Sequence, residues 1–279
     1  MLNQAYLPRA VSIHSPGELH HHHSFSSDVL GNQRSLVVYL PPGYHADHTR
    51  RYPVLYFQDG QNLFDGRTSY IADQHWRLNE AADSLINAGE IEPLIIVGIY
   101  HAGEHRITEY TPSMDRNFKV GGKADLYGRM LISEIKPFID REYRTLPDAF
   151  YTGLGGSSLG GLVSLYLGLK HPSHFSRLAV MSPSIWWDRR RILREVDNLA
   201  GKPPLRVWLD MGTHEGRNQL SHAVSLRDKL TARGFILDQD LKYMEVDGGR
   251  HSEHDWAQRV HHALRYLFPA SQRRSSDKE

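Results

Sequence analysis

The feature that most restricts the fold is a glycine-rich stretch in the middle of the chain, residues 152–161, with the sequence TGLGGSSLGG. Within it, residues 156–160 have the form Gly-x-Ser-x-Gly. This pattern is typical of a sharp turn between a buried strand and a helix, with the central serine held in a strained backbone conformation and its hydroxyl exposed. Ser158 is therefore a candidate nucleophile on a fold that packs helices against a sheet.

The pattern alone has an alternative interpretation, because it arises by chance in roughly one of ten chains of this size. It could be an ordinary turn of small residues, with Ser157 as a helix cap. The flanking sequence favours the first interpretation. Phe150-Tyr151-Thr152 is predicted to be a short buried strand, residues 162–169 are apolar like a helix packed on a sheet, and His171-Pro172 ends that helix.

Outside this stretch, apolar runs of strand length alternate with runs at helical spacing. Strands are predicted at 34–40, 52–57, 91–100, 178–181, 205–211 and 240–246, and helices at 76–87, 125–143, 219–233 and 256–268. This alternation predicts an α/β fold with an open, mostly parallel sheet and helices on both faces, a three-layer sandwich.

The whole chain, residues 1–279, is predicted to form one domain with poorly defined ends. Residues 1–28 are expected to be a weakly patterned leader, and residues 270–279 a polar tail. Four consecutive histidines, residues 20–23, are expected in an exposed loop or at an edge, because no carboxylate lies at a fixed spacing from them for metal binding.

Composition excludes several classes of function. The net charge of +1 provides no overall field that would attract nucleic acid. No apolar run reaches the roughly 18–20 residues that span a bilayer, and the absence of cysteine excludes disulfides and cysteine-ligated zinc. The N-terminus lacks the charged and then apolar pattern of a signal peptide, so a cytoplasmic location is expected. Nothing in the sequence indicates an oligomeric state.

A serine hydroxyl needs a base within hydrogen-bond reach and a carboxylate that orients the base. In folds with this turn, the acid and then the histidine follow the serine along the chain. His251 lies in the loop after the last predicted strand, directly before a capping sequence at residues 252–255. Glu215 follows the preceding strand and is the favoured acid, with Asp210 and Asp247 as alternatives.

Two further segments follow predicted strands and could line a site at the carboxyl edge of the sheet. The loop 58–62 contains Gly60, which would let a backbone N–H approach a negatively charged oxygen; an ordinary Asp-Gly turn would have the same residues. Trp186 and Trp187 could form a wall of the cleft, although packing in the core or in a lid accounts for them equally well.

His101, Glu104 and His105 match the zinc pattern His-x-x-Glu-His. That interpretation requires both histidines on one helical face. Gly103 interrupts the segment, which follows directly from a predicted strand, so zinc is a minor alternative.

Taken together, these stretches make the chain resemble the putative esterase family of the α/β hydrolases, which includes esterase D-like, enterochelin esterase-like and feruloyl-type carbohydrate esterases. The resemblance extends from about residue 29 to residue 268. The matching stretches are 38–44, 53–62, 106–112, 134–140, 156–161, 212–215, and His251 with Trp256.

The resemblance implies an α/β-hydrolase fold and a catalytic triad of Ser158, Glu215 and His251. The acid varies most within the family. It also implies an oxyanion hole at the backbone of Leu159 and around Gly60 and Gln61, a small-molecule ester as substrate, and no metal or cofactor. Arg106, which begins one matching stretch, joins Trp186 and Trp187 as a candidate substrate contact.

The expected function is therefore carboxylic ester hydrolysis through an acyl-enzyme. Three alternatives stay open. The first is an acyltransferase of the same fold, in which an alcohol other than water accepts the acyl group. The second is a zinc hydrolase that uses His101, Glu104 and His105. The third is a non-catalytic binding protein on a hydrolase scaffold.

Overall fold

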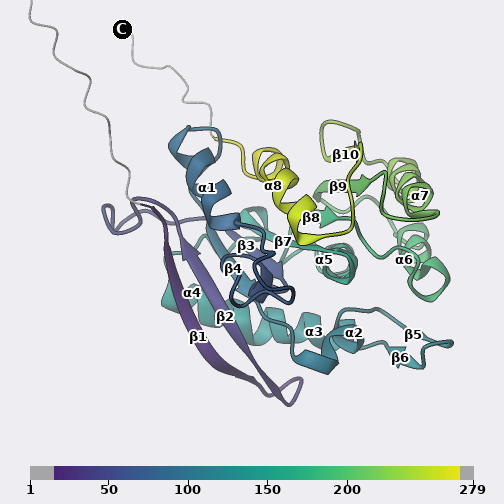
Figure 1. Ribbon diagram of the computed structural model, residues 1–279, viewed down its shortest axis with the longest axis horizontal. Coiled ribbons are helices and arrows are strands. Elements are labelled where there is room, and N and C mark those ends of the chain that lie inside the picture. Colours follow the sequence, from purple (N-terminus) through teal and green to yellow (C-terminus); the bar gives the residue numbers. More distant parts are fainter. Residues whose placement is uncertain (1–15, 271–279) are drawn as a thin grey trace, which may run out of the picture.

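The computed structural model describes residues 16–270, and its centre is an eight-stranded sheet (Figure 1). The strands are β1 (Glu18–Ser27), β2 (Asn32–Leu40), β3 (Val54–Gln58), β4 (Ile95–Ile99), β7 (Thr152–Ser157), β8 (Arg177–Met181), β9 (Arg206–Gly212) and β10 (Leu241–Val246). They lie in the order β1-β2-β4-β3-β7-β8-β9-β10. β2 is antiparallel to β1 and β4, and all other neighbours are parallel. The predicted open, mostly parallel sheet is confirmed.

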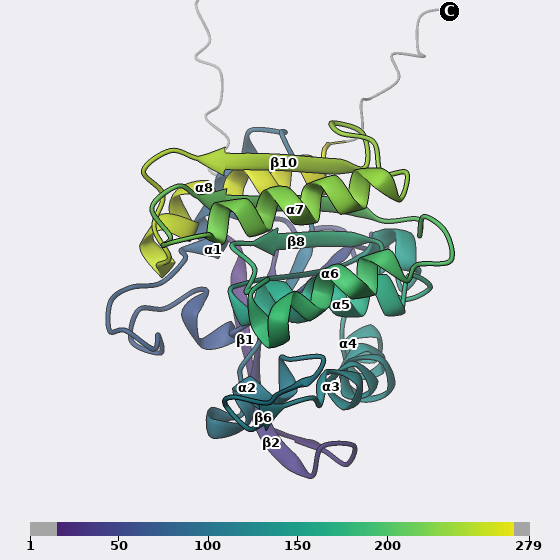
Figure 2. The ribbon, with the colours of Figure 1, turned by 90° about the vertical axis from the view of Figure 1, so that its right-hand side faces the viewer.

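Helices cover both faces of the sheet, and a separate hydrophobic core lies under each layer. One core contains apolar residues of α1 (Leu78–Asn87) and α8 (Glu253–Leu267). The other lies under α3 (Ala124–Met130), α4 (Lys136–Glu142), α5 (Leu159–Lys170), α6 (Trp187–Asp197) and α7 (Gln219–Ala232). Figure 2 views the molecule from the side of α5, α6 and α7. The predicted three layers are therefore present.

The remaining elements are short. A helical turn, α2 (Arg106–Glu109), precedes a hairpin of β5 (Met114–Asp115) and β6 (Val120–Gly121), and a π-helical segment, η3 (Leu131–Ile135), joins α3 to α4. Pro137 lies in the first turn of α4, directly after the π-helical segment. No helix in the described part of the chain combines the length and the apolar character needed to cross a membrane.

The position of the central strand β7 corrects the sequence prediction. Residues 149–151 form a 3-10 turn, with Phe150 66% exposed, and the strand is the glycine-rich run Thr152–Ser157 itself. The glycines have a packing role, since a Cβ on Gly155 would lie 2.6 Å from the ring of Phe57. The prediction failed because a glycine run is typical of a turn and lacks the side chains that usually mark a strand.

The predicted leader is also wrong for residues 18–27, which form the edge strand β1, paired with β2 along its length. The four histidines lie on this strand. His22 faces Tyr143, with Nε2 2.6 Å from the phenolic oxygen, while His21 and His23 stack on each other. Leu19 and Phe25 pack against the two cores, but the histidines between them leave no apolar alternation that would reveal a strand. The predicted tail, apart from its first residue, lies outside the described residues.

Candidate active site

The site begins at the turn between β7 and α5, where Ser158 lies between the last residue of the strand and the first residue of the helix. Its backbone has φ 56° and ψ −123°, a conformation that costs a non-glycine residue of the order of 1–3 kcal/mol. The predicted strand, sharp turn and helix are therefore present. The side chain is half-buried, and its Oγ lies 3.2 Å from Oγ of Ser184.

His251 is held at the opposite side of the site by the start of α8. Ser252 caps this helix, accepting a hydrogen bond of 3.2 Å from the backbone N–H of Asp255, and a side-chain oxygen of Asp255 accepts one of 2.9 Å from the backbone N–H of Arg250. The loop on both sides of His251 is thereby tied to the helix. The imidazole packs edge-on against the ring of Trp256, at 4.8 Å between centroids.

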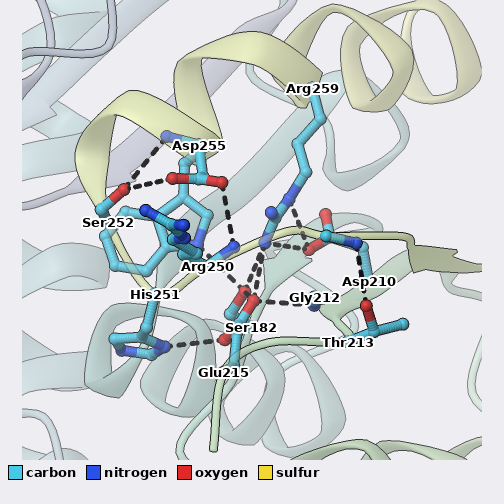
Figure 3. Close-up of polar contacts among 12 residues, drawn as sticks. Ser182, Asp210, Gly212, Thr213, Glu215, Arg250, His251, Ser252, Asp255 and Arg259 are labelled. Atoms are coloured by element: carbon cyan, nitrogen blue, oxygen red, sulfur yellow. Dashed lines mark hydrogen bonds and ion pairs between the residues drawn. The ribbon is translucent and has the colours of Figure 1, made fainter.

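Glu215 joins this histidine from the loop after β9 (Figure 3). Its Oε2 lies 2.7 Å from Nδ1 of His251, and its side chain is fully buried. Its Oε1 accepts hydrogen bonds from Oγ of Ser182 at 2.5 Å, the backbone N–H of Gly212 at 2.7 Å and Nη2 of Arg259 at 3.0 Å. The geometry of the carboxylate is therefore fixed on both oxygens.

These contacts also determine the protonation state of Glu215. Burial raises the pKa of a carboxyl group, but here hydrogen bonds from His251, Ser182 and Gly212 outweigh burial and lower the pKa of Glu215 below its ordinary value. Glu215 is consequently a carboxylate at neutral pH.

The two alternative acids lie elsewhere. Asp210 is fully buried within β9, where its oxygens accept from Arg259 and from the indole N–H of Trp208 at 2.7 Å. Asp247 is exposed and lies 3.5 Å from the hydroxyl of Thr213. Of the three carboxylates, Glu215 is the one that contacts His251.

Ser158 and His251 line one cavity, whose volume is about 450 Å³. The cavity wall also includes Gln61, Arg106 and Trp256. In this conformation the Ser158 hydroxyl contacts Ser184 and not His251. Catalytic hydrogen bonds are often long or misaligned before substrate binds, so this arrangement is compatible with proton transfer between them.

Two backbone N–H groups that belong to the predicted oxyanion hole occupy the starts of helical turns. Leu159 is the first residue of α5, and Gln61 lies in the 3-10 turn η1 (Gly60–Asn62). N–H groups at these positions have no acceptor within their own helix, and no acceptor for either is found among residues 16–270. Gly60 lies against β4, where a Cβ would be 2.4 Å from the backbone of Gly98.

Arg106 lines the cavity, but its charge is already paired. Its Nε and Nη2 each lie 2.7 Å from an oxygen of Asp59, and its guanidinium stacks over Tyr110. Sequence reasoning missed Asp59, which takes a left-handed conformation at the end of β3, with φ 57°. The Asp-Gly pair in the sequence was the signal that the backbone turns there.

The two tryptophans lie apart from this cavity. Trp187 is buried, and its indole N–H donates to the carbonyl of Ser113 at 2.9 Å. Trp186 is 39% exposed, and Phe118 from the hairpin β5–β6 packs against both rings. Neither tryptophan lines the cavity that contains Ser158.

The zinc pattern is not assembled as a metal site. His101 is half-buried, and Glu104 and His105 are exposed in the short turn η2 (Gly103–His105). His101 and Glu104 line the cavity, whereas His105 does not. Burial lowers the pKa of His101. Within residues 16–270, no three histidine, aspartate or glutamate side chains are grouped closely enough to hold a metal ion.

Comparison with known proteins identifies the family. The family described as Putative esterase matches residues 27–267, most of the chain. The protein belongs to this esterase family. Membership makes it an enzyme that hydrolyses carboxylic esters.

Two of the three relatives given below are named as esterases. The chain is 28% identical to the Bacillus subtilis protein YbbA, covering 88% of this chain and 96% of that protein. It is 24% identical to the ferri-bacillibactin esterase BesA of the same organism, covering 72% and 73%. It is also 31% identical over 166 residues to an endo-1,4-beta-xylanase/feruloyl esterase of Xylanibacter ruminicola, but covers only 21% of that longer protein.

Solved structures of this esterase fold superpose over most of the chain. A ferulic acid esterase gives a TM-score of 0.73 at 18% identity, covering 91% of this chain and 99% of the other. The enterobactin esterase FES of Shigella flexneri gives 0.71 at 20% identity, covering 91% and 58%. At these identities the likeness shows the fold alone.

Proposed function

We propose that this esterase works through an acyl-enzyme, with Ser158 as nucleophile, His251 as general base and Glu215 as the acid that orients the base. The observation that carries this proposal is the 2.7 Å contact between Nδ1 of His251 and Oε2 of Glu215, made by a histidine that lines the same cavity as Ser158. Since a carboxylate accepts at Nδ1, the neutral imidazole carries its proton there. Nε2 is left free to accept the proton of the serine.

The reaction then proceeds in two halves. Oγ of Ser158 attacks the ester carbonyl while its proton passes to His251, and the N–H groups of Leu159 and Gln61 stabilise the negative oxygen that forms. His251 returns the proton to the leaving alcohol, and the acyl group stays on Oγ. Water, activated by His251, releases the carboxylic acid and restores Ser158.

The cavity supports an ester with an apolar or aromatic part as substrate. Its volume of about 450 Å³ suits a small ligand. Tyr70, Ile71 and Ile107 line it with largely exposed apolar surface, while Asp59, Arg106 and Glu253 supply polar groups. Feruloyl esters, which the name of one relative specifies, combine such aromatic and polar parts, and other relatives are named for siderophore esters. Rates on acetyl, feruloyl and catechol-bearing esters would rank these classes.

The proposal is tested by covalent labelling of the purified protein. A fluorophosphonate probe is expected to add once, at Ser158, and to abolish hydrolysis of p-nitrophenyl acetate in proportion to labelling. Peptide mass mapping identifies the modified residue. Activity that survives complete labelling, or that a zinc chelator removes, would contradict the serine mechanism.

Replacing Glu215 with glutamine is expected to lower kcat by about 10⁴ with little change in fold. Three donors surround Oε1, so the amide oxygen takes that position and the amide NH₂ faces Nδ1 of His251. The imidazole must then carry its proton on Nε2 and cannot accept one from Ser158. Steady-state kinetics measure the loss. Glu245→Gln, at an exposed position on β10, is the matched control, and an equal loss there would contradict the role of Glu215.

A further inference from the structure

Arg259 lies buried between two buried carboxylates, of which only one contacts the histidine of the site. Its guanidinium is 3.0 Å from Glu215 and 3.1 Å from Asp210, and the three side chains are 3%, 0% and 0% exposed. Figure 3 shows the side chain of Arg259 extending from α8 to Glu215 and Asp210. Replacing buried ion pairs with well-packed apolar residues is often neutral or stabilising, so stability alone does not account for this cluster.

Asp210 is suited to remain ionised in this cluster. Its Oδ1 accepts from Nε of Arg259 at 3.1 Å, and its Oδ2 accepts from the indole N–H of Trp208 at 2.7 Å. Burial raises the pKa of Asp210. However, both oxygens face N–H donors, so a proton on either would disrupt a hydrogen bond.

Ser182 connects the arginine to Glu215 a second time. Its hydroxyl donates to Glu215 at 2.5 Å and accepts from Nη2 of Arg259 at 2.5 Å and from the indole N–H of Trp256 at 3.0 Å. Ser182 directly follows β8 and has φ 41°, a rare backbone conformation for serine. Sequence reasoning missed Ser182 and Arg259, although Ser182 follows a strand at the carboxyl edge of the sheet.

The charges suggest what Asp210 contributes. Alone, Arg259 would offset the negative charge of Glu215 and weaken its support for a protonated His251. Asp210 cancels that positive charge, so Glu215 presents a full negative charge to the imidazole. We propose that Arg259 and Asp210 are positioning residues of the active site: Arg259 holds Glu215 in place, and Asp210 balances the charge of Arg259.

This inference rests on the proposed function of Ser158, His251 and Glu215. Other titratable or charged groups that line the cavity with His251 are Glu253 on the first turn of α8, Asp59 paired with Arg106, and His101 and Glu104. They are unchanged in the variants below, so their effect on the pH dependence is common to all of them.

The test is the pH dependence of kcat/KM for an activated ester, measured with Asp210→Asn and Arg259→Met. Removing the negative charge of Asp210 disfavours the protonated imidazole, so the acid limb should move to lower pH by roughly half a unit to one unit. Removing the positive charge of Arg259 favours the protonated form, so the limb should move to higher pH by a similar amount. The double variant should return it towards the wild-type position.

Two further variants separate charge from packing. Arg259→Lys keeps the charge and should leave the limb close to wild type even if stability falls. Arg177→Met removes another buried, ion-paired arginine, at the start of β8 and so at the end of that strand away from Ser182, and should lower stability without moving the limb. Thermal melting identifies variants that do not fold. If Arg259→Met does not fold, the position of the acid limb in Asp210→Asn and Arg259→Lys still tests the proposal.

Opposite shifts in Asp210→Asn and Arg259→Met, or the downward shift in Asp210→Asn alone if the methionine variant does not fold, support the proposal. The proposal is overturned if the variants fold and their acid limbs either stay in place or move in the same direction. Failure of the proposed function gives a different result, because Ser158→Ala would then retain activity. If Ser158→Ala is inactive and the limbs do not move, only the present inference is wrong.

Discussion

Replacing Ser158 with alanine is expected to reduce kcat for ester hydrolysis by about 10⁵–10⁶. The cavity and the two N–H donors are retained, so the variant should still bind substrate and polarise its carbonyl. It loses the atom that forms the acyl-enzyme, and only direct attack by water is left. The expected fold is unchanged, because alanine removes only a hydroxyl whose hydrogen bond within the described residues is with Ser184.

Steady-state kinetics with p-nitrophenyl acetate measure the loss. The variant should also fail to react with a fluorophosphonate probe. Ser157→Ala is the matched control, since Ser157 is the adjacent serine, ends β7 and lines the same cavity. It should keep activity within about tenfold. If Ser157→Ala were inactive and Ser158→Ala active, the assignment of the nucleophile would be reversed.

Replacing His251 with alanine is expected to cost about as much, 10⁵–10⁶ in kcat, because a serine without a base is almost entirely protonated at neutral pH. The two losses should not add. The double variant Ser158→Ala, His251→Ala is expected to be no slower than either single variant, since each alone already prevents formation of the acyl-enzyme.

His254→Ala is the matched control for the histidine. His254 is exposed in the first turn of α8, three residues beyond His251, so its loss should leave kcat near wild type. Full additivity of the two active-site losses would indicate that Ser158 and His251 act in separate steps, and would overturn the mechanism.

Sequence reasoning succeeded where apolar side chains mark the structure. The runs that became β3, β4, β8 and β9 consist almost wholly of buried residues, so both their existence and their parallel arrangement could be predicted. It failed at β1 and β7 for opposite reasons. β1 is an edge strand whose run of histidines hides its few apolar residues, and β7 is a strand whose glycines make room for its neighbours.

Part of the candidate site could likewise be predicted from the sequence, and part could not. Ser158, Glu215 and His251 could be chosen because each follows a strand in an order that the fold requires. Arg259 could not be chosen from the sequence, since it lies in the middle of a helix and reaches the site only after α8 packs on β9. The pairing of Arg106 with Asp59 also depends on contacts between residues distant in sequence.

The order of the parts along the chain affects when the enzyme becomes active. Ser158 and the turn that carries it are made well before His251, which lies just before α8, and Arg259, which lies within α8. On the ribosome, a nascent chain would therefore carry an exposed serine with no base beside it. In the mechanism we propose, hydrolysis begins only once the C-terminal helix has emerged and docked. A chain released early, before α8, is therefore expected to carry the proposed nucleophile but to have no activity.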